Sequence, residues 1–331
     1  FFRINTQGTP LDTIEEALLK YRKRPIAISS RAVIRAGMGH RYWSRFAGEN
    51  AAKVETIAKD LHATLFDPEL TSPIKTLDLP LGGAKGIRAA LQVLIEYFSI
   101  ANNSQTQKNI TIDFGGDDET GALTVQVLNK GLHLAQRITG NSHGSLGLHP
   151  AVYFYGPTGV HSIPMFLGTA MLISEKINNN DSGFFRCFSD KREIIEATLI
   201  THKDLIATVL QKTYSKKRAA NYYQILSNLY EAAKQGNEIT QENIVTWGGV
   251  VGKVIVGTEI NPSIDFNDEA KSYTFIATAL KTAAKCPICS GYLDTAKSVS
   301  YDHKTPKKDG GTGDKDNCQI THPYCNQAIK N

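Results

Sequence analysis

The stretch CPICSGYLDTAKSVSYDHKTPKKDGGTGDKDNCQITHPYCN, residues 286–326, decides what the C-terminal part of this chain can fold into. It opens with Cys286-Pro-Ile-Cys289 and closes with His322-Pro-Tyr-Cys325, so two residues separate the potential ligands within each pair. Thiolates and imidazoles are the ligands of tetrahedral structural zinc sites. Two such pairs around a compact polar segment predict one zinc ion held by all four side chains, with scattered thiols as the alternative. Because the protein fills every position, the zinc is expected to be structural.

The segment between the two pairs predicts a small strand–loop–strand–helix unit. Its expected order is a strand at 299–303, a loop at 304–316, a returning strand at 317–320 and a helix from Pro323 onward. Side chains alternate along a strand, so Asp302 and His303 point to opposite faces unless the strand ends there. Cys318 is interpreted as a small core residue and not as a fifth ligand.

The same stretch resembles the zinc-containing members of the HNH (ββα-metal) endonuclease family. In that family Cys-x-x-Cys, Asp-His, Gly-Gly, Asn-x-Gln and Cys-x-x-Cys-Asn follow one another. The matching residues are Cys286 and Cys289, Asp302 and His303, Gly310 and Gly311, Asn317 and Gln319, then His322, Cys325 and Asn326. Two positions depart from the pattern: His322 replaces a Cys, and Asn326 stands where the eponymous motif has His. Both keep a side chain that can bind a metal.

The resemblance implies a role for each matching residue. His303 would be the general base that deprotonates the attacking water, and Asn317 would orient its ring. Asp302 and Asn326 would hold one divalent cation, Mg²⁺ or Mn²⁺, against the scissile phosphate. Such a reaction needs an activated water and a neutralised phosphoryl charge, and oxygen ligands favour a hard cation. The alternatives are a surface histidine beside an acid for His303 and a turn residue for Asn317.

Basic residues suggest where DNA could bind. Lys304, Lys307 and Lys308 flank the proposed active loop and are well placed to contact phosphates. Basic and aromatic residues also alternate in residues 20–24, 40–45 and 216–223, where a solvated helix face is the commoner explanation. The formal net charge of +5 is compatible with a nucleic-acid partner but does not require one.

The remainder of the chain predicts a mostly helical region. Its 331 residues are enough for two domains. Helical spacing of apolar residues recurs at 50–65, 86–101, 163–178, 191–213, 217–235 and 273–284. We therefore expect an α+β fold: a helical regulatory or sensor domain at 1–270, and a zinc-stapled ββα-metal (HNH) module at 271–331.

The first residues carry a second resemblance. Phe2, Arg3, Ile4, Asn5, Gly8 and Leu11 are similar to the third motif of the modification-dependent restriction proteins of the GmrS/GmrD type. There the motif belongs to a ParB-like NTP-binding domain, whose earlier motifs would lie upstream of Phe1. The resemblance implies an NTP as a further cofactor, with Arg3 and Asn5 contacting phosphate or ribose. A strand–turn–helix with a buried Asn is the alternative.

Membrane and secretion signals are not expected. The longest apolar stretch, residues 163–173, contains Pro164 and is shorter than the roughly 20 residues that span a bilayer. It predicts a buried helix. The first residues, Phe1-Phe2-Arg3, lack the features of a signal peptide. A cytoplasmic, reducing location follows, in which the five cysteines are thiols or metal ligands.

Three functional hypotheses result. The first is a metal-dependent DNA endonuclease acting in restriction or defence against phage or modified DNA. A single-metal module cuts one strand per visit, so double-strand cleavage would require a homodimer. The second is a zinc-stapled DNA-binding module without catalysis, and the third is an NTP-regulated sensor. Loss of cleavage on His303→Ala would separate the first from the second.

Overall fold

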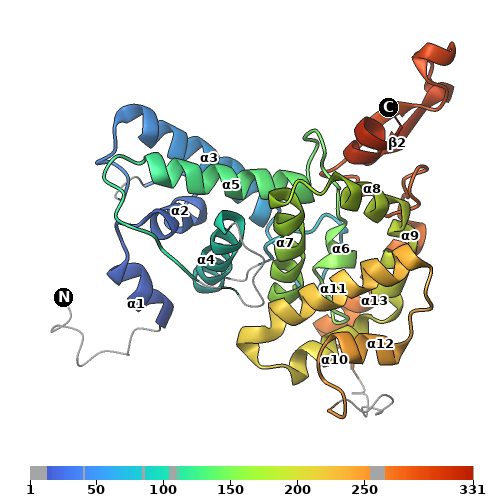
Figure 1. Cartoon of the computed structure of the whole chain (residues 1–331), viewed down its shortest axis with the longest axis horizontal. Coiled ribbons are helices and arrows are strands. Elements are labelled where there is room, and N and C mark those ends of the chain that lie inside the picture. Colours follow the sequence, from blue (N-terminus) through green and yellow to red (C-terminus); the bar gives the residue numbers. More distant parts are fainter. Residues whose placement is uncertain are drawn as a thin grey trace. The chain divides into compact units, whose positions relative to one another are not determined.

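The computed structural model describes residues 13–39, 42–83, 86–103, 110, 112–253 and 265–330. Over these residues the chain is mostly helical and carries one two-stranded sheet near its C-terminus, which confirms the predicted α+β class (Figure 1). The N-terminal motif, including Arg3 and Asn5, lies outside the described residues. Among the described helices, none has the length and apolar character needed to cross a bilayer.

The chain divides into two compact units. The first comprises Phe1–Ala63, Ala84–Asn102 and Thr111–Leu132, and the second comprises Thr64–Gly83, Asn103–Ile110 and His133–Asn331. The predicted domain boundary near residue 270 falls inside the second unit. Where the predicted C-terminal module begins therefore remains a prediction.

The first unit is built around α2, which is buried along almost its whole length. Its helices are α1 (Thr13–Lys20), α2 (Pro25–Ile34), most of α3 (Gly48–Phe66), α4 (Ile87–Asn102) and the first part of α5 (Ala122–Ile138). Helix α2 begins at Pro25, whose fixed φ suits a first helical position, and packs against α4. Just before α5, the buried Asp118 carboxylate accepts hydrogen bonds from the amides of Gly121 and Thr124 and from the Thr124 hydroxyl. These bonds satisfy amides at the start of the helix.

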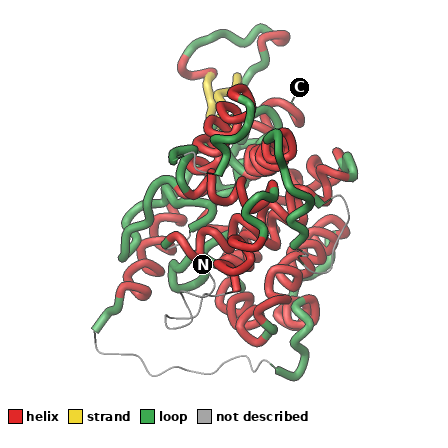
Figure 2. The backbone as a smooth tube through the Cα atoms, turned by 90° about the vertical axis from the view of Figure 1, so that its left-hand side faces the viewer, coloured by secondary structure: helices red, strands yellow, loops and turns green. Residues whose placement is uncertain are grey.

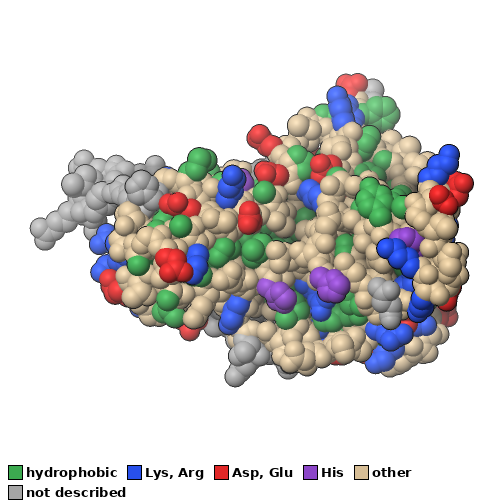
Figure 3. Space-filling view, turned by 90° about the horizontal axis from the view of Figure 1, so that it is seen from above, with side chains coloured by type: hydrophobic (Ala, Val, Ile, Leu, Met, Phe, Trp, Pro, Cys, Tyr) green, Lys and Arg blue, Asp and Glu red, His purple; other side chains and the backbone are tan. Residues whose placement is uncertain are grey.

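Several basic side chains of the first unit are paired with acids. Lys23 and Arg45 each lie 3.8 Å from a Glu119 carboxylate oxygen, and Arg24 lies 3.7 Å from Asp117. On the face drawn in Figure 3, basic and acidic side chains are interspersed. A phosphate at residues 20–24 or 45 would compete with these carboxylates, which favours the interpretation of a solvated surface.

The second unit packs its helices around α7 and α11. Its described helices are α6 (Pro150–Tyr153), α7 (Ile163–Asn178), α8 (Ser182–Asp190), α9 (Arg192–Thr201), α10 (Lys203–Lys212), α11 (Arg218–Gln235), α12 (Gln241–Trp247) and α13 (Asp268–Thr282). The predicted buried helix is confirmed as α7. Helices α7 and α11 approach so closely that a Cβ at Gly168 would lie 2.6 Å from the Ala219 backbone oxygen.

The sheet consists of β1 (Ser300–His303) and β2 (Cys318–Thr321), which run antiparallel. Asp302 pairs with Gln319, and His303 pairs with Cys318. A loop between the strands, shown in Figure 2, extends away from them. After β2 the chain turns into η4 (Cys325–Ile329), a short π-helix that contacts β1. The predicted strand–loop–strand–helix order is therefore confirmed, with the second strand starting one residue later than expected.

Candidate metal centre and active site

The four predicted zinc ligands come together in one buried cluster. The ligand atoms of Cys286, Cys289, His322 and Cys325 all lie within 4.8 Å of one another. Nδ1 of His322 is 3.3 Å from Sγ of Cys289 and 3.9 Å from Sγ of Cys325. Tetrahedral zinc with sulfur and nitrogen ligands separates such atoms by roughly 3.5 Å. The geometry and the donor set therefore fit a structural zinc ion.

The orientation of His322 explains why Nδ1 faces the sulfur atoms. Its Nε2 lies 3.0 Å from the backbone oxygen of Tyr292, and a carbonyl can only accept, so Nε2 carries the hydrogen. The lone pair of Nδ1 is then left for the metal, as is usual for a metal-binding histidine. Burial lowers the pKa of His322, which keeps the ring neutral.

The Cys-x-x-Cys turn, which we call the zinc knuckle (residues 286–292), is closed by its own backbone. The amide of Ser290 donates to the Cys286 oxygen at 2.8 Å, and the amide of Cys286 donates to the Gly291 oxygen at 2.9 Å. Ser290 adopts a left-handed φ of 55° to complete the turn. Hydrogen bonding with Cys289 lowers the pKa of Cys286, while the same contact raises the pKa of Cys289 to about 12. The thiolate is the form in which a cysteine binds zinc.

Helix α9 holds the zinc knuckle in place. The Glu196 carboxylate accepts from the Tyr292 amide at 2.7 Å and from the Tyr153 hydroxyl at 3.1 Å. Arg192, which is 1% exposed, donates to Glu196 at 2.6 Å and to the backbone oxygens of Leu146 and Gly147. This chain of bonds connects the zinc ligand His322, through Tyr292, to the helices of the second unit.

Arg192 is buried as a charged group because every part of its guanidinium has a partner. Burial by itself would lower its pKa, but the Glu196 carboxylate, together with nearby Tyr153 and Cys289, outweighs burial and raises the pKa of Arg192. The side chain lies against the knuckle, where a Cβ on Gly291 would come within 2.5 Å of its Cδ. A residue larger than glycine at 291 would therefore displace either Arg192 or the knuckle.

Strand β1 carries two of the predicted active-site residues. Asp302 is 8% exposed, and its Oδ2 accepts from Nε2 of Gln319, its cross-strand partner, at 2.8 Å. His303 is half-buried and is the last residue of β1, so the chain turns immediately after it. His303 is still paired with Cys318 within β1, so its side chain and that of Asp302 alternate along the strand, and their use of one site remains a prediction.

The η4 helix places Asn326 against β1. Its Nδ2 donates to Oγ of Ser300 at 2.7 Å and to the Tyr301 backbone oxygen at 3.1 Å. Ser300 and Asp302 share one face of the strand, because side chains two residues apart point the same way. Asn326 therefore lies on the same side of β1 as the Asp302 carboxylate. These two side chains could hold the divalent cation.

Asn317 ties together the two ends of the loop. Its Oδ1 accepts from the Thr305 amide at 2.7 Å, and its Nδ2 donates to the backbone oxygens of Thr305 and Thr312 at 3.2 and 2.7 Å. Its own backbone oxygen accepts from the Lys304 amide at 2.8 Å. The side chain thus bonds to the backbone of the loop that follows His303, and a role in orienting the His303 ring remains a prediction.

The paired glycines meet two separate requirements of this loop. Gly310 has a left-handed φ of 83°. A Cβ on Gly311 would lie 1.8 Å from the Thr305 backbone oxygen.

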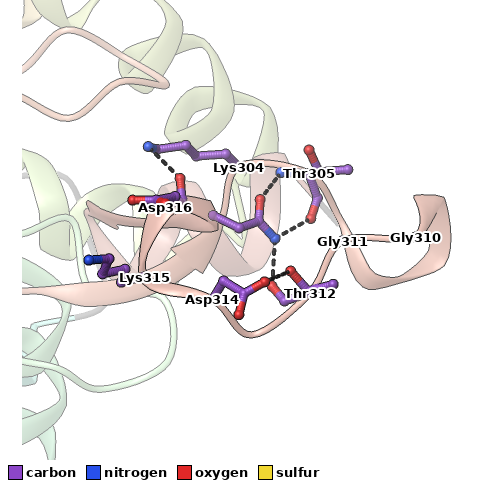
Figure 4. Close-up of a pocket in the computed structure, with 9 residues that line it drawn as sticks. Lys304, Thr305, Gly310, Gly311, Thr312, Asp314, Lys315 and Asp316 are labelled. Carbon is purple, nitrogen blue, oxygen red and sulfur yellow. Dashed lines mark hydrogen bonds between the residues drawn. The ribbon is translucent and has the colours of Figure 1, made fainter.

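Figure 4 shows the pocket that this loop encloses, with Lys304 and Lys315 among its residues. Nζ of Lys304 donates to the Asp316 backbone oxygen at 2.8 Å, whereas Lys307 and Lys308 lie exposed on a short helical turn.

Comparison with known families connects these features. Residues 286–331 match the family model described as HNH endonuclease. This HNH module contains the zinc cluster, both strands and the η4 helix. No curated protein and no solved structure matches the chain. The match does not extend to the N-terminal resemblance, which is left without support from the comparisons.

Some residues of the site were not predicted from the sequence. Arg192 and Glu196 lie far from the zinc ligands along the chain, and their i,i+4 spacing is common to many surface ion pairs. Lys330, by contrast, follows Asn326 by one helical turn, and that spacing could have indicated a second side chain facing β1. Its ammonium contacts the Asp302 carboxylate at 2.6 Å.

Proposed function

We propose that the chain is a metal-dependent endonuclease that hydrolyses phosphodiester bonds in DNA. The observation that supports this most is that Asn326 bonds to Ser300, whose side chain shares a face of β1 with Asp302, in the strand whose last residue is His303. A structural zinc site alone would require only its four ligands. The Asp, His and Asn in this arrangement supply the oxygen ligands and the imidazole that a hydrolytic site needs.

The proposed reaction uses each residue in a defined way. A neutral His303 takes a proton from the attacking water, while the loop closed by Asn317 keeps its backbone in position. Asp302 and Asn326 supply the oxygen ligands for Mg²⁺ or Mn²⁺, which when bound neutralises charge on the phosphoryl group and leaving oxygen. A cation is already accepted at this position, because the Lys330 ammonium lies 2.6 Å from Asp302. Lys307 and Lys308 contact flanking phosphates.

Cleavage of supercoiled plasmid with and without Mg²⁺ or Mn²⁺ tests this proposal. Wild type should convert the plasmid to nicked circles only with the divalent ion, and Asp302→Asn should fail to do so while still binding DNA. A nick as the first product is expected of a monomer, whereas direct double-strand breaks would indicate a homodimer. Plasmid that stays intact at every metal concentration, under conditions where DNA binds, would contradict the proposal.

A second candidate is a zinc-stapled DNA-binding module that does not cleave. The contact between Lys330 and Asp302 favours it, since an ammonium on the carboxylate removes the need for a metal there. The same plasmid assay distinguishes the two, because this module would bind DNA and leave it uncut.

A role in restriction or phage defence is a finer proposal that rests on the resemblance of residues 2–11. Digestion of modified and unmodified phage DNA, with and without nucleotide, tests it. Preference for modified DNA that depends on NTP would support it, and equal digestion in all four conditions would argue against it.

A further inference from the structure

Lys330 makes three contacts at the edge of β1, and the proposed reaction gives it no role. Its Nζ donates to Oδ2 of Asp302 at 2.6 Å, to the backbone oxygen of His303, and to that of Lys304 at 3.5 Å. Its side chain is 22% exposed, and that of Asp302 is 8% exposed. The ammonium is therefore held among oxygen atoms at the position proposed for the divalent ion.

The geometry of η4 explains how Lys330 reaches this position. The amide of Lys330 donates to the oxygen of Cys325 at 3.2 Å, the i→i+5 bond of a π-turn. Asn326 contacts Ser300 and Tyr301, and Lys330 contacts the next part of the same strand, so η4 lies along β1. The helix is fixed at its start by Cys325, one of the four residues of the zinc cluster.

For electrostatic reasons, Lys330 and a divalent cation cannot both bind the Asp302 carboxylate. A mostly buried carboxylate needs a charged or hydrogen-bonded partner, because an unpaired buried charge is strongly unfavourable. Gln319 supplies one hydrogen bond, and Lys330 supplies the positive charge. A divalent cation bound to the same oxygen would lie within a few ångströms of the ammonium and repel it.

We propose that Lys330 is a built-in counter-ion of Asp302 that competes with the catalytic metal and must leave the carboxylate when the metal binds. This inference rests on the proposed function. Lys330 sets the metal affinity of the module: the site stays neutralised without a metal and accepts one only by releasing the lysine. The released ammonium remains beside His303. There it can pair with a DNA phosphate, which is an anionic oxygen acceptor like the carboxylate.

Mn²⁺ binding to the zinc-loaded full chain, measured without DNA by electron paramagnetic resonance, tests the inference. Wild type, Lys330→Met, Lys330→Arg and Asp302→Asn are compared. Lys330→Met removes the competing charge and should bind Mn²⁺ about tenfold more tightly than wild type, the factor that corresponds to ~1.4 kcal/mol. Lys330→Arg keeps the charge and should stay within a few-fold of wild type. Asp302→Asn should lose Mn²⁺ binding, which would show that the bound Mn²⁺ of wild type lies at Asp302.

The outcomes separate this inference from the proposed function. Equal or weaker Mn²⁺ binding by Lys330→Met, with zinc content and melting temperature preserved, would overturn the role of Lys330 and leave the endonuclease proposal intact. Absence of Mn²⁺ binding in wild type and in Lys330→Met would overturn both. If Lys330→Met loses zinc, Lys330→Gln replaces it in the same titration. Lys330→Gln should also bind Mn²⁺ more tightly than wild type, and equal or weaker binding would overturn the role of Lys330.

Discussion

His322 donates its Nε2 hydrogen to the backbone oxygen of Tyr292 over 3.0 Å, and this bond connects the zinc cluster to the helical part of the second unit. The amide of the same Tyr292 donates to Glu196 at 2.7 Å. One residue thus bridges a metal ligand and a buried carboxylate. The zinc centre should therefore stabilise more of the chain than the HNH module alone, because zinc binding energy contributes to folding.

Removing zinc should destabilise the helical part of the second unit as well as the zinc cluster. Cys286→Ser should reduce zinc from one ion per chain toward none and lower the melting temperature, because a three-ligand site binds zinc weakly. Cys318→Ser is the matched control, since Cys318 is outside the cluster and is exposed; its interpretation as a core residue was wrong. Zinc content by mass spectrometry and melting by circular dichroism are the measurements. A Cys286→Ser protein with full zinc content would show that the ligand set is wrong.

Gly291 should tolerate no side chain. Its Cβ would meet Arg192 at 2.5 Å, and overpacking of this kind costs about 1–3 kcal/mol. Gly291→Ala should lower the free energy of unfolding by that amount in denaturant titrations. Gly313→Ala, where a Cβ meets nothing within 4 Å, should change it little. Equal stability of the two variants would mean that Arg192 does not press against the knuckle.

Acid should destabilise the chain through His149. This residue is 2% exposed, and its Nδ1 caps α6 by accepting from the Ala151 amide at 3.2 Å. Burial, together with nearby Lys203 and Arg192, lowers the pKa of His149 from 6.5 to about 3. Between these values the unfolded chain binds the proton and the folded chain does not. Stability contributed by His149 therefore falls as pH falls below 6.5, by about 1.4 kcal/mol per unit.

His149→Asn is the matched variant for this effect. Asparagine keeps an acceptor that can cap the helix but does not titrate. Melting temperatures of both proteins between pH 7 and pH 5 should converge or cross, with wild type losing more. Zinc loss at low pH affects both proteins alike and cancels in the difference. Parallel curves over this range would mean that His149 is protonated in the folded chain.

Lys307 and Lys308 should contribute to DNA affinity independently of sequence. Both are exposed beside the loop that follows His303. Substituting either lysine by Gln removes one phosphate contact, which should reduce the slope of log affinity against log salt by about 0.9. Lys253→Gln, at an exposed site outside the HNH module, is the control. Fluorescence anisotropy at several salt concentrations gives the slopes. An unchanged slope in the variant with both Lys307 and Lys308 replaced by Gln would exclude these contacts.

The sequence predicted α11 from apolar residues at helical spacing and α7 from an apolar stretch that is buried without a break. Residues 163–178 and 217–235 are found as α7 and α11. Helix α2 was not predicted, because it is buried from Pro25 to Val33 and has no polar face to create a period. Helix α5 was not predicted either, since Gly131 lies inside it; the close approach of Phe98, 2.6 Å from a Cβ at that position, explains the glycine.

The candidate site was predicted wherever its residues lie close together in sequence. The zinc quartet follows from two short spacings, and the structure confirms that its four ligand atoms meet. The roles of Asp302, His303, Asn317 and Asn326 remain predictions. Arg192 and Glu196 could not be found in advance, because only the folded chain brings α9 against the knuckle. Lys330 was missed although its spacing of one helical turn from Asn326 places it toward β1, because the sequence does not show that Asp302 is its partner.

Single-turnover nicking of supercoiled plasmid by wild type and His303→Ala, both zinc-loaded and in saturating Mg²⁺, is the sharpest test of hydrolysis by this site. Loss of a general base should slow cleavage by about 10²–10⁴-fold, while DNA affinity and zinc content stay at wild-type levels. Cleavage by His303→Ala at the wild-type rate would mean that His303 is not the base and that the proposed reaction is wrong.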